Sequence, residues 1–178
     1  MEALSPRQLA QKAQEEYQKK NFISAAGLYK AAAEGFLTSG DELKAAEMAN
    51  DCSVAYLKGG NGQAALDATS GTDKVFEQKG DIRQQAIALG NQAAAMENMQ
   101  RFDEAIATYL KSAELLKEVG EFELRAYVMQ ALSRIQMRRR RYLEAYATLR
   151  EGIMGIRKPN FKQRLLKSLI QIPYNFLK

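Results

Sequence analysis

The sequence predicts an all-α fold, a solenoid built from antiparallel helix pairs. The first observation is a 40-residue register that runs through four copies without an insertion. The second is composition, because Ala is abundant, β-branched residues are sparse and Pro occurs only three times. Two positions within each copy hold a small residue: Ala13, Ser53, Ala93 and Ser133 at the first, and Ala25, Ala65, Ala105 and Ala145 at the second. A glycine ends each of the first three copies, at Gly40, Gly80 and Gly120.

The first unit is predicted over residues 5–40. Ser5, Pro6 and Gln8 have the pattern of a capping box with proline in the first helical position, so they begin the first helix of this unit. A second helix is expected over residues 22–38, where apolar residues recur at spacings of three and four.

The second unit, residues 41–80, has the weakest helix signals. We expect one helix over 41–58 and another over 63–79. The run from Thr69 to Thr72 is poor in helix formers, so the helix over 63–79 is predicted to be continuous but the weakest of the array. Gly62 stands where the other copies have an aromatic residue, which also predicts a looser second unit.

The third and fourth units, residues 81–120 and 121–158, repeat this plan. The two helices of the fourth unit are predicted over 122–138 and 142–156. The small residues in register have a packing role in this scheme. Two antiparallel helices joined by a short turn approach closely only where small side chains lie at their contact.

The last segment, residues 159–178, is predicted to be a basic amphipathic helix with a short tail. Phe161 opens this helix, and its apolar residues form one wide face from two stripes. Pro173 stands where a fifth unit needs its small residue, so the unit is not completed. The segment then caps the apolar end of the solenoid. The alternative is that it lies on a membrane or on a partner. The two stripes are Phe161, Leu165, Leu169 and Ile172, and Leu166 and Ile170.

Two motifs resemble a known repeat family. The segments Ala88-Leu89-Gly90-Asn91-Gln92-Ala93 and Arg101-Phe102-Asp103-Glu104-Ala105 are similar to the helix A motif and the intra-repeat turn of tetratricopeptide repeats, in the subclass with about 40 residues per repeat. The resemblance covers residues 5 to about 157. It implies a right-handed superhelix whose concave groove, lined by the first helix of each pair, binds a peptide or helix of another protein. It implies no catalytic activity.

Helical geometry then gives candidate groove residues. If the small residue of each first helix packs on its own partner helix, positions three before it and one, four and five after it face the groove. Asparagine side chains on such a surface can hydrogen-bond a bound backbone in both directions. The candidates are Asn50, Val54, Leu57, Lys58, Gly90, Asn91, Ala94, Glu97, Asn98, Gln130, Arg134, Met137 and Arg138.

The C-terminal part of the chain is strongly basic. Residues 138–178 carry eleven Lys or Arg against two Glu, a net charge of +9 within a chain of +5. Such a segment suits an anionic surface, but the arginine run itself is explained first as a solvated turn at the end of a helix, with the anionic contact as the alternative. The candidate contacts with an anionic surface are Arg139, Arg140, Arg141, Lys162, Arg164 and Lys167.

The sequence contains few of the residue types that catalysis or metal binding commonly uses. The chain has no His, and its single Cys52 can form neither an internal disulfide nor a cysteine-rich metal site. We expect no cofactor, no metal and no enzymatic activity, and we expect a cytoplasmic location because no secretory signal is visible.

Three functions remain after these exclusions. The first is a scaffold that binds a protein partner in its groove. The second is a peripheral membrane adaptor that docks through the basic C-terminal segment. The third is self-association through the exposed ends. Nucleic acid is the weakest anionic partner, because the arginine run lacks interleaved aromatic residues.

Overall fold

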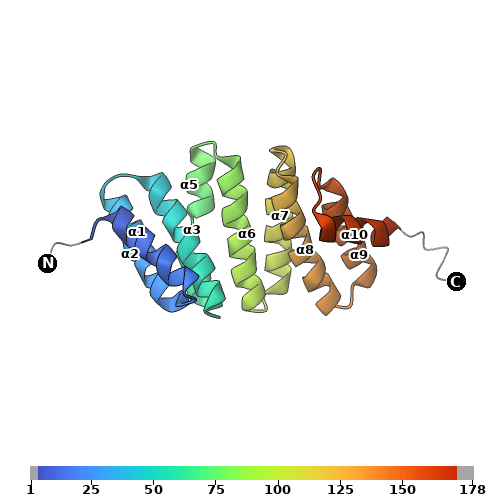
Figure 1. The fold of residues 1–178 in the computed structure, drawn as a ribbon, viewed down its shortest axis with the longest axis horizontal. Helices are drawn as coiled ribbons and strands as arrows, with labels where there is room; N and C mark the ends of the chain where they lie inside the picture. The colour runs from blue at the N-terminus through green and yellow to red at the C-terminus, as the bar shows by residue number, and fades with distance from the viewer. Residues whose placement is uncertain (1–3, 172–178) are drawn as a thin grey trace.

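The structure, a computed structural model, describes residues 4–171. In that part of the chain ten α-helices occur and no strand, and α1 to α9 succeed one another along the long axis of the molecule (Figure 1). The all-α solenoid of helix pairs predicted from the sequence is confirmed. The helices are α1 Pro6–Gln18, α2 Phe22–Thr38, α3 Glu42–Lys58, α4 Gly62–Ala68, α5 Thr72–Gln78, α6 Ile82–Asn98, α7 Phe102–Glu118, α8 Phe122–Arg138, α9 Tyr142–Gly155 and α10 Phe161–Gln171.

The turns of the array close in one way, through a residue in the left-handed conformation. The following backbone N–H then donates to a carbonyl five residues back, as from Glu121 to Leu116 at 2.8 Å, which is the Schellman arrangement. These turns are evenly spaced, so they divide each repeat into two equal halves. The left-handed residues are Lys20, Gly40, Gly60, Gly80, Gln100, Gly120 and Arg140, with φ between 59° and 81°.

The helix starts follow the sequence signals. Ser5 and Gln8 form the predicted capping box. The carboxylates of Asp41 and Asp81 accept hydrogen bonds from the backbone N–H groups of Lys44 and Gln84, at 3.0 and 2.9 Å. These caps satisfy amide groups that the first turn of a helix leaves without a partner.

The small residues in register lie where the helices meet. Each is at most 6% exposed, and the Ser133 hydroxyl donates to the Ala145 carbonyl across the α8–α9 pair at 2.7 Å. Larger side chains fill the space above and below these contacts. In the third and fourth units Tyr109, Met129, Leu132 and Ile135 form one buried cluster with the alanines.

The single helix predicted over residues 63–79 is wrong, because the chain breaks there into α4 and α5. Gly71 takes the left-handed conformation, with φ of 78°. Buried side chains then replace the lost helical hydrogen bonds. The hydroxyls of Thr69 and Thr72 donate to Oδ1 of Asn50, at 3.1 and 3.0 Å, and Gln92 donates to the Thr69 carbonyl at 3.0 Å.

Gly62 marks a close approach, which corrects the expectation that it loosens the second unit. It is buried, and a Cβ atom at this position would lie 2.5 Å from Oδ1 of Asn98 and 3.0 Å from Cγ of Met99. The missing side chain lets the start of α4 pack against the end of α6. A larger residue here would push the two helices apart.

Helix α10 lies across the end of the row rather than along it (Figure 1). Its contacts fall on α9, where the Tyr146 hydroxyl donates to the Ile170 carbonyl at 2.8 Å. Ile170 is buried, but Phe161 is 82% and Leu165 56% exposed. Within the described side chains, α9 therefore covers only part of the apolar face predicted for this helix, the part that holds Ile170. Ile172, Pro173 and the tail lie outside the described residues.

None of the described helices is long and apolar enough to cross a membrane.

Candidate functional site

The first helices of the four pairs, α1, α3, α6 and α8, share one surface, the first-helix face. Two adjoining hollows open on it, and Val54 borders both. The central hollow, of about 590 Å³, lies between α3, α6 and α8. Nine of the predicted groove residues line it, namely Val54, Leu57, Lys58, Asn91, Ala94, Glu97, Asn98, Arg134 and Arg138.

One arginine of the central hollow is held in place from below. Arg134 donates through Nε and Nη2 to the two carboxylate oxygens of Glu97, at 3.1 and 3.2 Å. The Tyr109 hydroxyl donates to the same carboxylate at 3.1 Å. The hydrogen bond to Glu97 raises the pKa of Arg134, so the guanidinium stays charged. The two parallel hydrogen bonds to Glu97 fix the orientation of the Arg134 guanidinium and leave its remaining N–H donors for a ligand.

The second arginine has an aromatic support. The guanidinium of Arg138 lies 5.0 Å from the centre of the Phe102 ring, within cation–π range. Lys58 and the half-buried Asn91 reach the same hollow and make no hydrogen bond or ion pair within residues 4–171. The central hollow therefore combines three positive charges, one of them paired with Glu97, with free amide groups. This arrangement suits carboxylate side chains and exposed backbone groups of another protein.

Four predicted groove residues do not line the central hollow, namely Asn50, Gly90, Gln130 and Met137. Asn50 is only 5% exposed and accepts the two threonine hydrogen bonds at the α4–α5 break, so its placement in the groove is wrong. Gln130 lines a smaller hollow, of about 220 Å³, between α8, α9 and α10. Gln130 is exposed and borders α10 instead of the central hollow.

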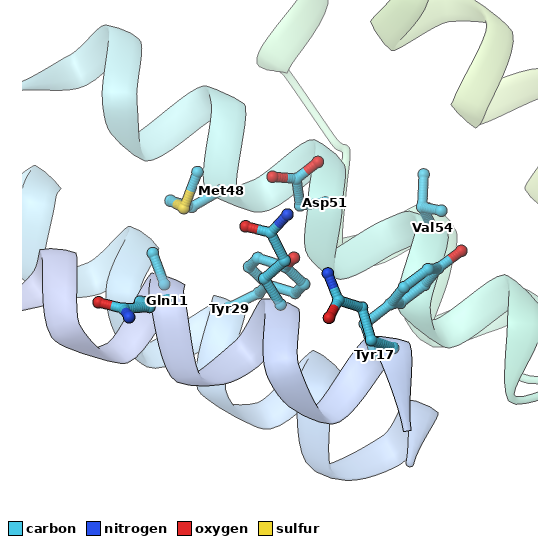
Figure 2. Close-up of a pocket in the computed structure, with 9 residues that line it drawn as sticks. Gln11, Tyr17, Tyr29, Met48, Asp51 and Val54 are labelled. Atoms are coloured by element: carbon cyan, nitrogen blue, oxygen red, sulfur yellow. The ribbon is translucent and has the colours of Figure 1, made fainter. Parts of the chain in front are cut away.

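The sequence interpretation missed the N-terminal hollow, of about 710 Å³, between α1 and α3. Figure 2 shows Gln11 and Tyr17 on α1, Tyr29 behind them, and Met48, Asp51 and Val54 on α3. The available signal was the groove rule itself. Applied around Ala13, it selects Ala10, Gln14, Tyr17 and Gln18, and all four line this hollow.

Asp51 is the charged residue among those that line the N-terminal hollow. Loss of surrounding water, together with the carboxylate of Glu47, raises the pKa of Asp51 to about 6. Burial, with smaller contributions from Asp51 and Tyr17, raises the pKa of Tyr29 to about 12. Both groups therefore favour their uncharged forms more than free side chains do.

Comparison with known proteins assigns the fold to a family. A family model described as soluble NSF attachment protein, SNAP, matches residues 6–168. The chain belongs to the SNAP family. No curated protein matches it. Members of this family are α-helical adaptors that bind other proteins and are in general not catalytic, so the earlier resemblance to tetratricopeptide repeats holds at the level of stacked helix pairs.

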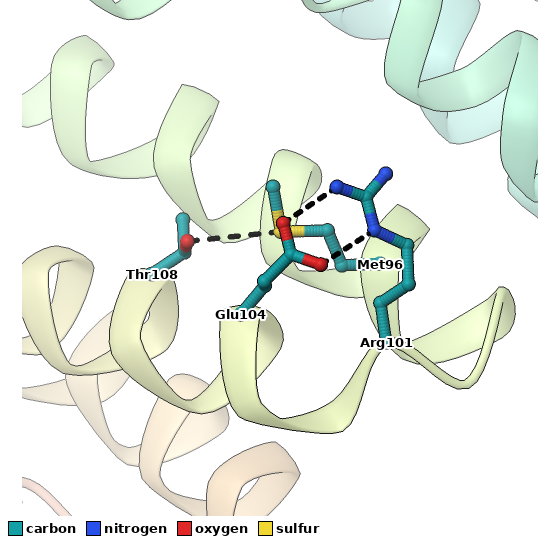
Figure 3. A network of polar contacts seen from close by, with 4 residues as sticks. All are labelled: Met96, Arg101, Glu104 and Thr108. Carbon is teal, nitrogen blue, oxygen red and sulfur yellow. Dashed lines mark hydrogen bonds and ion pairs between the residues drawn. The ribbon is translucent and has the colours of Figure 1, made fainter.

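In this SNAP-family chain much of the basic C-terminal charge has internal partners. Arg139 donates to Asp103 at 2.6 Å, and Arg141 pairs with Glu144. The second pair repeats the one between Arg101 and Glu104 one unit earlier, where two hydrogen bonds of 2.7 and 2.5 Å join the groups (Figure 3). These pairs stabilise the turns and reduce the charge offered to a ligand.

The remaining predicted contacts with an anionic surface divide in the same way. Lys167 donates to the carbonyls of Ile156 and Met154, at 2.7 and 3.4 Å, and so caps the end of α9. Arg164 donates to the Pro159 carbonyl at 3.1 Å. Arg140 is exposed and has no partner within residues 4–171. The side chain of Lys162 lies outside the described residues.

Metal-ligating clusters and a reactive cysteine are both absent from the described residues. Residues 4–171 hold no group of three or more His, Cys, Asp or Glu that could bind a metal ion. The Cys52 thiol is buried, donates to the Ala26 carbonyl at 3.3 Å, and has a pKa raised by burial to about 11. A thiol in this state is a poor nucleophile.

Proposed function

We propose that the chain is a non-enzymatic adaptor that binds a helical or extended segment of a partner protein along its first-helix face. The observation that carries this proposal is the central hollow, where Lys58, Arg134 and Arg138 meet around the free amide of Asn91. The hydrogen bonds that orient Arg134 reduce the ordering needed when a ligand binds, which favours affinity.

Family membership suggests the class of partner. SNAP-family proteins bind SNARE complexes, and the family description names attachment to NSF. We extend both relations to this chain. Acidic side chains of a SNARE-type complex would then lie over the three positive groups of the central hollow.

The test removes positive charge without disturbing the fold. A double variant, Lys58→Ala with Arg138→Ala, leaves Arg134 in place, because losing Arg134 would strand the carboxylate of Glu97. Its affinity for a purified SNARE complex, measured by calorimetry, should fall by roughly tenfold, and less so at high salt.

A control with the same loss of charge separates a local effect from a general one. The matched variant, Lys111→Ala with Arg150→Ala, changes exposed residues on the second helices α7 and α9. It should bind like the wild type. Equal affinities for both double variants would contradict binding through the central hollow.

The basic end supports a second candidate, a peripheral contact with the cytoplasmic side of a membrane. The supporting observation is the outer side of α10, where Phe161 and Leu165 are exposed beside Arg164. Sedimentation with anionic vesicles at low salt should retain the wild type and lose a Phe161→Ser, Leu165→Ser variant. Failure of the wild type to sediment at low salt would contradict it, and self-association of the protein alone would appear in sedimentation without vesicles.

A further inference from the structure

The N-terminal hollow contains two polar groups that the fold leaves without partners. Asp51 makes no ion pair or hydrogen bond within residues 4–171. Tyr29 is only 8% exposed, yet its hydroxyl, which lines the same hollow, also has no hydrogen bond there. The Tyr29 ring is buried, but its hydroxyl and the exposed Asp51 carboxylate open on the hollow, so both groups are available to a ligand that enters from the first-helix face.

The walls of the hollow indicate the chemistry of that ligand. Tyr17 and Tyr29 offer aromatic rings, Asp51 offers a carboxylate and Gln11 offers an amide oxygen (Figure 2). Gln14 and Gln18, which also line the hollow, offer two more amide oxygens. A flat cation with several N–H donors matches all three features. An arginine guanidinium has this shape, stacks on aromatic rings and pairs with a carboxylate.

The repeat itself shows that the carboxylate is a local feature. In the other three repeats the positions equivalent to Asp51 are Gln11, Asn91 and Ala131, which carry no charge. The stacking of α3 therefore does not require an acid at this position. Its raised pKa agrees, because it indicates that the folded chain holds the ionised group at a cost.

We infer that the N-terminal hollow binds the guanidinium group of an arginine of the partner protein, with Asp51 as its counter-ion. This inference deepens the proposed function and rests on it. The central hollow is positive and the N-terminal hollow negative, so a partner segment would lie on the first-helix face in one direction. Its arginine would lie between α1 and α3, and its acidic residues over α6 and α8.

The test uses a small probe in place of the partner. Nα-acetyl-L-arginine methylamide carries one guanidinium and no other charge, and its citrulline analogue has nearly the same shape without the charge. Titration of the full chain, followed through NMR signals of the tyrosine rings, should give a Kd on the order of millimolar for the arginine probe. The citrulline probe should bind about tenfold more weakly, a difference of about 1.4 kcal/mol.

Asp51→Asn is the decisive variant, because asparagine is the residue of the third repeat at this position. It should fold at least as stably as the wild type and bind the arginine probe about tenfold more weakly. Glu47→Gln, a charge removed from the same helix but outside the hollow lining, should bind it with less than a twofold change. Equal binding of both probes, no binding of either, or unchanged binding by Asp51→Asn would overturn the inference.

The same titration separates this inference from the proposed function. The Lys58→Ala, Arg138→Ala variant lacks charges of the central hollow only, so it should bind the arginine probe like the wild type. If that variant keeps its affinity for a SNARE complex while Asp51→Asn loses the probe, the proposed partner site fails and the arginine pocket stands. If the probe ignores Asp51 while SNARE binding falls as proposed, the pocket fails and the adaptor function stands.

Discussion

The left-handed turns allow the same substitution, glycine to alanine, to be tested with opposite outcomes at two nearby positions. Gly80 has φ of 72°, and a Cβ atom added there would meet no atom within 4 Å. Gly90 lies inside α6, where an added Cβ would be in ordinary contact with Oγ of Ser112 at 3.5 Å. Crowding is thus absent at both positions, and backbone conformation alone decides the outcome.

The expected magnitudes follow from that difference. An L-residue in the left-handed region costs about 1–2 kcal/mol, and replacing glycine recovers about 0.4–1 kcal/mol from the less flexible unfolded chain. Gly80→Ala should therefore lower the free energy of unfolding by about 1 kcal/mol. Inside a helix, alanine is better than glycine by about 1 kcal/mol, so Gly90→Ala should raise it by a similar amount.

Thermal and urea denaturation followed by circular dichroism measure both changes. Each kcal/mol should shift Tm by about 2–4 °C in a chain of this size, downward for Gly80→Ala and upward for Gly90→Ala. Gly40→Ala repeats the first test, since Gly40 has φ of 81° and equally open surroundings. Shifts in the same direction for Gly80 and Gly90 would refute the assignment of the turn conformation.

Three further changes test other parts of the structure. Gly152→Ala should destabilise the α8–α9 pair by about 1–3 kcal/mol, because its Cβ would lie 2.7 Å from Cβ of Met129, whereas Gly27→Ala, with nothing within 4 Å, should not destabilise in the same denaturation assay. Gln100→Gly should stabilise by about 0.5 kcal/mol, since Gln100 has φ of 61°, and an unchanged urea midpoint would count against strain there. Asp51→Asn should stabilise by about 1 kcal/mol at pH 7.5 and by nothing near pH 3.5: a folded pKa of about 6, above the ordinary 3.8, means that ionisation destabilises the fold as pH rises through this window. The exposure of Asp51 keeps the effect below the full value of the pKa shift. A stability difference independent of pH would contradict that reasoning.

The sequence predicted the helices well because each boundary depends on local chemistry. Ser5, Asp41 and Asp81 begin helices, and glycines in register end them, within a few residues of the predicted positions. The even spacing of the turns at half a repeat stayed hidden, because Lys20, Gln100 and Arg140 adopt the left-handed conformation without being glycine. Side-chain identity does not mark the turn at those positions.

Long-range contacts account for the errors. Thr69 and Thr72 were interpreted as poor helix formers within one helix, but their hydroxyls donate hydrogen bonds to Asn50 of the preceding helix. That contact both breaks the helix and removes Asn50 from the groove. Gly62 was expected to loosen the second unit, because nothing in its own segment shows that Asn98 and Met99 occupy the space that a side chain at this position would need.

The candidate site was partly predictable for the same reason. The helical offsets from the small residues found most of the central hollow, since they depend on one helix at a time. They could not show that Gln130 lines a separate hollow beside α10, nor that Lys167 donates to the carbonyls at the end of α9. Contacts between elements that are not neighbours in a repeat need the structure.

The uniform turns have a consequence for how such a chain can change its length. The backbone has the same left-handed conformation at both ends of a whole repeat, as at Gly40 and Gly80 or at Gly80 and Gly120. Duplicating or excising such a repeat rejoins the chain in phase and preserves the direction of every later helix. The extent of the binding surface can therefore grow or shrink by whole modules, while the chemistry of each hollow is set separately by the few residues that line it.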